Sequence, residues 1–295
     1  MGGRTAKGKA IVNILPIPPG VSVAAVRPVD REEVNWGDLQ IGFATTQGDV
    51  RRNRLSDFTN VRSNGKIAMK LPEGVELVNA RICSEDDDVM LTTDSGRAIR
   101  FSSTDLRVMN SRASTGVRGI RLTGSDRVVS MSVIRHFEAT PDERVAYLKM
   151  RRAMAGVTED EASDDEVPTN FNLSQERYTE MAAVENLILT ITRGGSGKLF
   201  SSHDYPVRGR GGMGVAAMDK AMRSGPVVAS LPVEMSDQIM VVTSNVQSNR
   251  CPIDGISFRS STAGGVRVFY ANGDENVVSV AYILYRGDEQ REGDR

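Results

Sequence analysis

Three glycines, Gly209, Gly211 and Gly214, stand in the spacing G-x-G-x-x-G. In a dinucleotide-binding fold this spacing forms the turn that cradles a pyrophosphate. Such a turn needs a strand before it, a helix that opens on it, and an acidic ribose ligand about 20 residues later. The surrounding stretch "VRGRGGMGVAAM" has strand-like alternation on both sides and no helical pattern after it. We therefore interpret the three glycines as turn residues and not as a nucleotide site.

Other residues with chemical potential give weaker signals. His203 and Asp204 resemble part of a catalytic dyad, but Asp204 occupies a repeated position and no nucleophile recurs beside it, which predicts a turn-capping role. The acidic run from Glu159 to Glu166 lacks the glycine and the spaced oxygen ligands of a calcium loop. The stretch "GGSGK" lacks the spacing of a P-loop. With 2 Cys and 2 His in the chain, the sequence predicts no catalytic residue, no metal site and no cofactor of its own.

Charge is distributed unevenly along the 295 residues. The formal net charge is −1, but residues 136–186 hold 12 acidic and 5 basic side chains, and the tail 287–295 holds 4 and 2. The rest of the chain therefore carries +8, which favours a nucleic-acid partner. No stretch has the roughly 18 apolar residues of a membrane span, and the first residues have no apolar signal core. We expect a cytoplasmic, chromosome-associated protein with no membrane partner, and the low cysteine count agrees with a reducing compartment.

The elements that position these residues repeat along the chain. Three stretches align around a glycine turn, and a fourth matches more loosely: "FATTQGDVRRNRLSDF" (43–58), "LTTDSGRAIRFSSTDL" (91–106), "TITRGGSGKLFSSHDY" (190–205) and "VVTSNVQSNRCPIDGI" (241–256). Each has two alternating runs about a turn, followed by an Asp nine residues after it. This pattern predicts four β-hairpins, with turns at Gly48, Gly96, Gly195 and Asn245.

An arginine, a glycine-containing turn and another alternating run follow each hairpin. These closing strands begin at Arg62, Arg112, Arg208 and Arg259, and a fifth copy begins at Arg4. With one further strand per repeat, a unit has about four strands and a period near 50 residues, which is typical of a β-propeller or a related blade array. The expected fold is therefore all-β, with about four to five blades present.

One segment interrupts the repeats. Residues 140–156 have helical spacing, with Thr140 as N-cap and Glu143 three residues on, and the acidic, apolar-poor residues 157–175 indicate loop or disorder. We therefore expect the domain organisation to follow four ranges. They are blades over 1–135, an acidic helical or disordered insertion over 136–186, further blades of the same array over 187–286, and a disordered acidic tail over 287–295.

Three strings, "RTAKGKAIVNILP", "GKIAMKLPEG" and "TGVRGIRL", resemble the C-terminal domain of the DNA gyrase A protein. This resemblance implies a β-pinwheel, a six-bladed relative of the propeller in which neighbouring blades exchange a strand. It also implies that DNA cleavage and ATP hydrolysis reside elsewhere in the enzyme, so that this chain has no catalytic residues although it belongs to an ATP-hydrolysing topoisomerase. The family's wrapping motif, Q-[RK]-R-G-G-[RK]-G, is absent; residues 208–214 echo it, with Met213 at its second basic position. We expect the chain to begin partway through a blade.

Lysines and arginines of the hairpins and of the turns before the closing strands are the candidate DNA contacts, because such residues can follow a phosphate path without reading sequence. The candidates are Lys7, Lys9, Arg51, Arg52, Arg54, Lys66, Arg97, Arg100, Arg118, Lys198, Arg208 and Arg210. Basic residues on strand edges also serve solvation and edge protection. A structural role fits the arginines that stand at the same point of each repeat, which are Arg62, Arg112, Arg208 and Arg259. Ligand contact fits better the residues at non-equivalent positions, which are Arg51, Arg52, Arg54 and Lys198.

The functional hypothesis is a module that binds and wraps duplex DNA without sequence preference. Its expected partners are double-stranded DNA, the remainder of the gyrase A protein, and the gyrase B protein. Two alternatives remain: the C-terminal domain of the A-type protein of topoisomerase IV, and a propeller scaffold that binds protein partners. Salt-sensitive, sequence-indifferent DNA binding distinguishes the first hypothesis from the scaffold.

Overall fold

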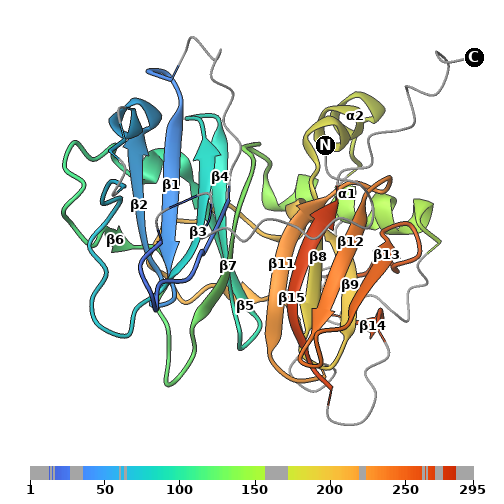
Figure 1. Ribbon diagram of the computed structural model, residues 1–295. Helices are drawn as coiled ribbons and strands as arrows, with labels where there is room; N and C mark the ends of the chain where they lie inside the picture. Colours follow the sequence, from blue (N-terminus) through green and yellow to red (C-terminus); the bar gives the residue numbers. More distant parts are fainter. Residues whose placement is uncertain are drawn as a thin grey trace, which may run out of the picture.

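Four antiparallel sheets form most of the computed structural model (Figure 1). The residues that it describes are 13, 15, 17–26, 36–59, 61–62, 65–156, 172–218, 224–260, 263, 265–269 and 275–283. The strands are β1 (Gln40–Thr45), β2 (Asp49–Arg54), β3 (Leu77–Cys83), β4 (Asp87–Thr93), β5 (Arg97–Ser102), β6 (Val117–Arg118), β7 (Val128–Arg135), β8 (Leu187–Thr192), β9 (Ser196–Ser201), β10 (Val215–Ala216), β11 (Val227–Val233), β12 (Gln238–Thr243), β13 (Ser248–Pro252), β14 (Val266–Arg267) and β15 (Val277–Ile283). Short 3-10 turns follow three hairpins, at Leu55–Phe58, Ser103–Asp105 and Ser202–Asp204.

Each sheet is built around one of the predicted hairpins. The strand orders are β3-β1-β2-β6, β10-β5-β4-β7, β11-β8-β9-β14 and β13-β12-β15. The alternating sequence explains the elements, because apolar positions of each hairpin enter the interior, such as Leu91 in β4 and Phe101 in β5. The all-β blade array expected from the sequence is confirmed.

Neighbouring blades exchange a strand. Strand β6 follows the β4–β5 hairpin in the chain but pairs with β2 of the preceding blade, where Val117 faces Val50. Strand β10 joins β5 and strand β14 joins β9 in the same way. These connections make the array a pinwheel. Within the described residues, β13 has no exchanged strand beside it.

One strand of each blade lies on the inner side of the array and packs against the same strand of the next blade. Strand β3 packs against β7, β7 against β11, and β11 against β15. The exchanged strands lie on the opposite side of their sheets, and β6 and β14 are seen at opposite margins of Figure 1. The segments that lead to the exchanged strands therefore run along the outside of the molecule. We call residues 59–71, 106–118, 205–217 and 257–269 the four outer loops. The last three contain β6, β10 and β14, whereas the described residues of the first form no strand, although the sequence predicts a closing strand after Arg62.

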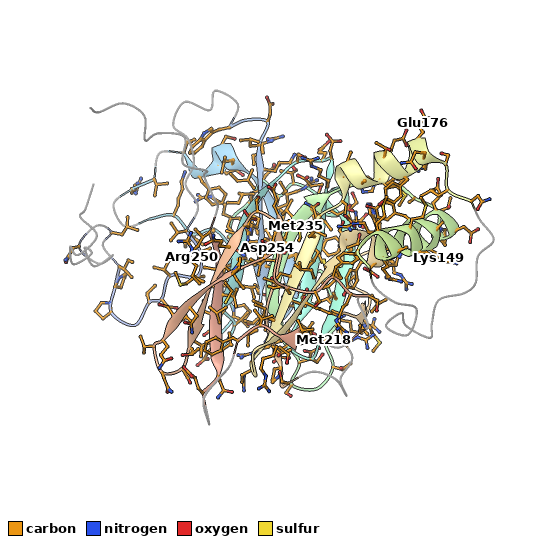
Figure 2. All side chains as sticks on the ribbon, turned by 90° about the vertical axis from the view of Figure 1, so that its right-hand side faces the viewer. Lys149, Glu176, Met218, Met235, Arg250 and Asp254 are labelled. Carbon is orange, nitrogen blue, oxygen red and sulfur yellow. The ribbon has the colours of Figure 1, made fainter. Side chains whose placement is uncertain are left out.

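The segment 136–186 contributes two helices, α1 (Pro141–Met154) and α2 (Gln175–Val184). The prediction for α1 is confirmed, including the capping box in which Thr140 and Glu143 bond each other's backbone N–H groups. The sequence indicates loop or disorder over 157–175 and assigns no separate helix to the rest of the insertion, whereas α2 begins at Gln175 after its N-cap Ser174. Lys149 and Glu176 mark the outer surface of the two helices (Figure 2). The acidic run 159–166 and the tail 287–295 lie outside the described residues.

The fourth hairpin turn differs from the prediction in its detail. Its left-handed residue is Val246, with φ of 61°, and not Asn245, whereas Gly48, Gly96 and Gly195 take this conformation in the other three turns. A β-branched residue is strained there. We expect Val246→Gly to raise the free energy of unfolding by about 1 kcal/mol, since relief of the strain exceeds the entropy cost of glycine.

This change is measured by urea denaturation followed by circular dichroism. Val246 is 86% exposed, so loss of side-chain packing does not complicate the comparison. The matched control is Val278→Gly in β15, which removes another exposed valine from a strand and is expected to destabilise. A lower stability for Val246→Gly would show that the turn is not strained.

Candidate nucleic-acid interface

Four of the predicted DNA contacts are buried. Arg51 and Lys198 are 0% exposed, Arg100 is 2% exposed, and Arg52 is 4% exposed. In this conformation their side chains cannot reach a phosphate, so the prediction is wrong for these four residues. Their burial has one cause, because an outer loop of the next unit lies across each of them.

The buried cations hold the outer loops in place. Arg51 donates from Nη1 to the carbonyl of Ser114 (2.7 Å), and Lys198 donates from Nζ to the carbonyls of Ser260 (2.9 Å) and Ala263 (2.6 Å). Arg100 donates from Nη1 to the carbonyl of Ser202 (2.8 Å) and to that of Tyr205 (3.4 Å), the first residue of the third outer loop, and it forms an ion pair with the buried Asp88 (2.7 Å). These side chains therefore tie the outer loops to the hairpins by charge-assisted hydrogen bonds to backbone carbonyls.

Strand β13 supports this explanation. Its Arg250 lies opposite Met240 in the register, at the position that Arg52 and Arg100 take in their own hairpins. Arg250 is exposed, and no exchanged strand lies beside β13 among the described residues (Figure 2). The same position is thus buried where an outer loop crosses it and exposed where none is described.

The outer loops carry exposed positive charge. Their sequences contain no Asp or Glu, and their basic residues are Arg62, Lys66, Lys70, Arg107, Arg112, Arg118, Arg208, Arg210, Arg259 and Arg267. All of these side chains are exposed except Arg112 and Arg259, which are half-buried. The exposed cations are therefore spread over the outside of neighbouring blades.

A groove of about 920 Å³ lies between the first two outer loops. Its wall includes three cations, Arg62, Lys66 and Arg112, and among the described lining residues there is no carboxylate. Lys66 donates to the carbonyls of Asp57 (3.0 Å) and Thr59 (2.7 Å), and Arg112 donates to that of Ile67 (3.3 Å). These bonds fix cationic groups at the rim of an open groove, which is an arrangement suited to an anionic backbone.

The remaining predicted contacts fall into three groups. Arg54, Lys66, Arg118, Arg208 and Arg210 are exposed, as a phosphate contact requires. Arg97 is half-buried and donates to the carbonyls of Met213 (2.8 Å) and Gly214 (2.7 Å), so it also fastens an outer loop. Lys7 and Lys9 lie outside the described residues.

Besides Arg62, for which a structural role was expected, three exposed cations of the outer loops were not among the predicted contacts: Lys70, Arg107 and Arg267. They stand outside the hairpins and away from the repeated arginine that precedes each closing strand. The absence of acidic residues from each loop is the sequence signal that could have found them.

The glycine-rich stretch is part of an outer loop. Gly214 has φ of +69°, and a Cβ at this position would lie 2.5 Å from the carbonyl oxygen of Ala98 in β5. Gly116 and Gly265 stand at the same point before β6 and β14, with Cβ positions 2.4 Å from Val50 O and 2.8 Å from Gly197 O. Glycine is needed there because the exchanged strand approaches the hairpin backbone closely. Among the described residues no helix begins at this stretch, which agrees with the interpretation as a turn.

His203 and Asp204 do not form a dyad. The His203 ring donates from Nε2 to the carbonyl of Met181 (3.0 Å), and its burial lowers its pKa, which favours the neutral ring. Asp204 accepts from the backbone N–H of Ser201 (3.2 Å) and pairs with Arg152 (3.1 Å), so the predicted capping role is confirmed. No cluster of metal-ligating side chains occurs in the part of the chain that the structure describes. None of the helices described there is long and apolar enough to cross a membrane.

A family model described as "DNA gyrase C-terminal domain, beta-propeller" matches residues 43–84, 87–135, 186–225 and 237–283. The chain belongs to this family. Each matched segment contains one of the four hairpins, and residues 136–185, which contain both helices, lie between two matches. The repeat found in the sequence is thus the repeat of the gyrase C-terminal domain family.

Relatives in this family include the DNA gyrase A protein of Granulibacter bethesdensis, which is 43% identical over 306 residues, covering 99% of this chain and 33% of the relative. The same protein of Rickettsia bellii is 37% identical over 288 residues, covering 97% of this chain and 32% of the relative. The chain therefore spans about a third of the length of these gyrase A proteins.

Two solved structures share the fold. A DNA gyrase A C-terminal domain superposes with a TM-score of 0.60 at 21% identity, over 84% of this chain and 66% of that one. A topoisomerase IV C-terminal domain superposes with a TM-score of 0.69 at 17% identity, over 94% of this chain and 70% of that one. At these identities the likeness concerns the fold of the gyrase family and its relatives.

Proposed function

We propose that this chain binds duplex DNA along its outer loops and bends it around the blade array, as the wrapping module of a DNA gyrase A protein. The observation that carries the proposal is the composition of those loops, which hold ten basic residues and no acidic one. Lysine and arginine that neutralise phosphates release counterions, and this favours binding without regard to base sequence. A curved row of such loops offers contacts to a bent duplex at several blades.

The membership in the gyrase family supports this function. Relatives named as the A protein of DNA gyrase align over nearly the whole chain, which favours gyrase over topoisomerase IV as the parent enzyme. The proposed partners are double-stranded DNA, the rest of the gyrase A protein, and the gyrase B protein, with the chromosome in the cytoplasm as the place of action. In this proposal DNA cleavage and ATP hydrolysis belong to those other parts, and the chain contributes to negative supercoiling by the path that it gives the DNA.

The proposal is tested with Arg118→Gln, a change at an exposed cation of the second outer loop. We expect weaker binding to a duplex of about 40 base pairs, whatever its sequence. The slope of log affinity against log salt should flatten by up to about 0.9, because one phosphate contact is lost. Dyes at the two ends of the duplex report bending in the same titration, since a duplex of this length is nearly straight when free.

The matched control is Lys149→Gln, which removes one exposed positive charge from helix α1 outside the outer loops. It should leave the salt slope unchanged. A wild-type chain whose affinity for DNA does not depend on salt would overturn the proposal and favour a scaffold for protein partners. Fluorescence energy transfer between the two dyes rises when the duplex is bent. If the chain bound the duplex tightly without such a rise, DNA binding would be supported but bending by this chain would be excluded.

A further inference from the structure

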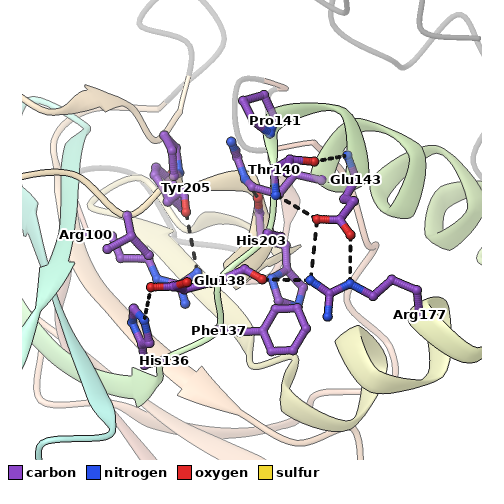
Figure 3. A pocket seen from close by; sticks show the side chains of 14 residues that line it. Arg100, His136, Phe137, Glu138, Thr140, Pro141, Glu143, Arg177, His203 and Tyr205 are labelled. Atoms are coloured by element: carbon purple, nitrogen blue, oxygen red, sulfur yellow. Dashed lines mark hydrogen bonds and ion pairs between the residues drawn. The ribbon is translucent and has the colours of Figure 1, made fainter. Parts of the chain in front are cut away.

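A cavity of about 800 Å³ lies where the two helices meet the third outer loop (Figure 3). One wall is the segment from His136 to Pro141, which connects β7 to α1. The helices contribute Arg144 and Arg177, and the outer loop contributes residues 205–207. The cavity is therefore shared between the insertion and the surface proposed above to bind DNA.

Arg144 is held rigidly in this wall without a matching carboxylate. Its Nε donates to the carbonyl of His203 (2.9 Å) and its Nη2 to that of Asp204 (3.2 Å). The carboxylate of Asp204 is paired instead with Arg152 (3.1 Å). Burial lowers the pKa of Arg144; the charge of Asp204 opposes this effect, and the charges of Arg100 and Arg208 add to it. Among the described residues Arg144 thus has carbonyl partners but no ion pair.

Other carboxylates at the cavity already have cationic partners. Asp88, beneath the wall, accepts from Arg100 (2.7 Å) and bonds Nδ1 of His136 (2.7 Å). Glu143 pairs with Arg177 (2.8 Å), which also pairs with Glu180 (2.8 Å). These ion pairs leave no carboxylate of this group for Arg144.

Glu138 and His203 also border the cavity. Glu138 is 93% exposed and lies 3.9 Å from Nε2 of His136. His203 is buried, and its lowered pKa favours the neutral ring. Among the described residues of the wall, Arg144 is therefore the cation that has no carboxylate partner.

Arg208 stands directly beyond the cavity-lining Val207. Its backbone N–H donates to the carbonyl of Arg100 (2.9 Å), which fixes its position, and its side chain is exposed. Two residues on, Arg210 donates to the carbonyls of Asp105 (3.2 Å) and Arg118 (3.1 Å) in the neighbouring unit. Cations thus continue from the helices along the third outer loop to the second.

We propose that this cavity is a phosphate-binding site, in which Arg144 and Arg208 bind a phosphate group of the DNA backbone. The planar guanidinium suits such a group because it presents paired N–H donors to phosphate oxygens. The insertion, although acidic in composition, then extends the DNA-binding surface beyond the blades. This inference rests on the proposed function, and its test separates the two.

The test compares Arg144→Gln and Arg208→Gln with the control Lys149→Gln in the full chain, on the same labelled duplex over a range of salt concentrations. Each of the first two changes is expected to weaken binding about fivefold at low salt and to flatten the salt slope by up to about 0.9. Lys149→Gln should stay within about twofold, as no phosphate contact is removed. If Arg144→Gln melts early, Arg144→Lys decides the result, because it keeps the positive charge but loses the planar pair of donors and should still bind DNA more weakly than the wild type.

The phosphate-binding site would be refuted if Arg144→Gln and Arg208→Gln both bound DNA with wild-type affinity while Arg118→Gln bound it more weakly. That result would leave the proposed function intact. A wild-type chain that binds no DNA would overturn both. Inorganic phosphate is then titrated while the Arg144 Nε–H resonance is followed by NMR. A shift of that resonance without any loss of DNA affinity in the variants would identify free phosphate as the occupant and overturn the assignment to DNA.

Discussion

Gly214→Ala is expected to lower the free energy of unfolding by about 3 kcal/mol or more, while Gly209→Ala in the same glycine-rich stretch stays within about 1 kcal/mol of the wild type. Gly214 combines a positive φ with a Cβ position 2.5 Å from Ala98 O, and that atom belongs to a strand that cannot yield easily. Gly209 has no heavy atom within 4 Å of its Cβ position. The loss at Gly214 reflects displacement of β10 from β5.

Urea denaturation followed by circular dichroism measures both variants, and Gly212→Ala is a third point because its Cβ position lies 3.6 Å from Ile99, an ordinary contact. The ranking expected is Gly209 and Gly212 near the wild type and Gly214 well below. Equal stabilities at the three positions would mean that the third outer loop does not approach β5 as closely as the structure shows.

Lys198→Met is expected to cost about 2–4 kcal/mol of folding free energy without a change in the salt slope of DNA binding. The carbonyls of Ser260 and Ala263 lose their charged donor, and a hydrogen bond to a charged group contributes about 1.5–3 kcal/mol. Part of this cost is offset because a charged group no longer has to be buried. The fourth outer loop should loosen, which hydrogen exchange at its amides would report.

Arg107→Met is the comparison for Lys198→Met, because it removes an exposed cation and not a buried one. Arg107 is exposed on the second outer loop. Its replacement should change stability by less than about 0.5 kcal/mol, as surface changes usually do, and flatten the salt slope by up to about 0.9. If instead Lys198→Met flattened the slope at full stability, the hairpin lysine would be a DNA contact, as its sequence position suggests.

The local pattern was enough to predict the hairpins, the closing strands β6, β10 and β14, and helix α1. These elements depend on alternation, turn glycines and a capping box, which are properties of neighbouring residues. It was not enough to predict which cations face solvent. Strand β2 has the sequence "DVRRNR", and a strand so polar suggests an exposed edge, yet Arg51 is buried by a loop whose Ser114 lies 63 residues further on.

The same limit explains two other differences. Helix α2 has a short sequence that borders an acidic stretch, and Tyr178 and Met181 of this helix are buried in a cluster with Tyr147 of α1. The cavity beside Arg144 joins residues from both helices, an outer loop and the connection after β7, so no contiguous motif marks it. Sites assembled from distant segments are defined by the fold and not by spacing.

The exchanged strands also bear on how the protein is made. A hairpin cannot be covered until the ribosome has produced the next unit, and the delay is set by separation along the chain. Arg51 and Ser114 are 63 residues apart and Lys198 and Ser260 are 62 apart, but Arg97 and Gly214 are 117 apart because the helices intervene. At about 5–20 residues per second, this last separation corresponds to roughly 6–23 seconds of synthesis. During that time the edge of β5 is open to pairing with other strands. Of the three hairpins that an exchanged strand covers, the one in the second blade therefore has the longest exposure to misassembly during synthesis.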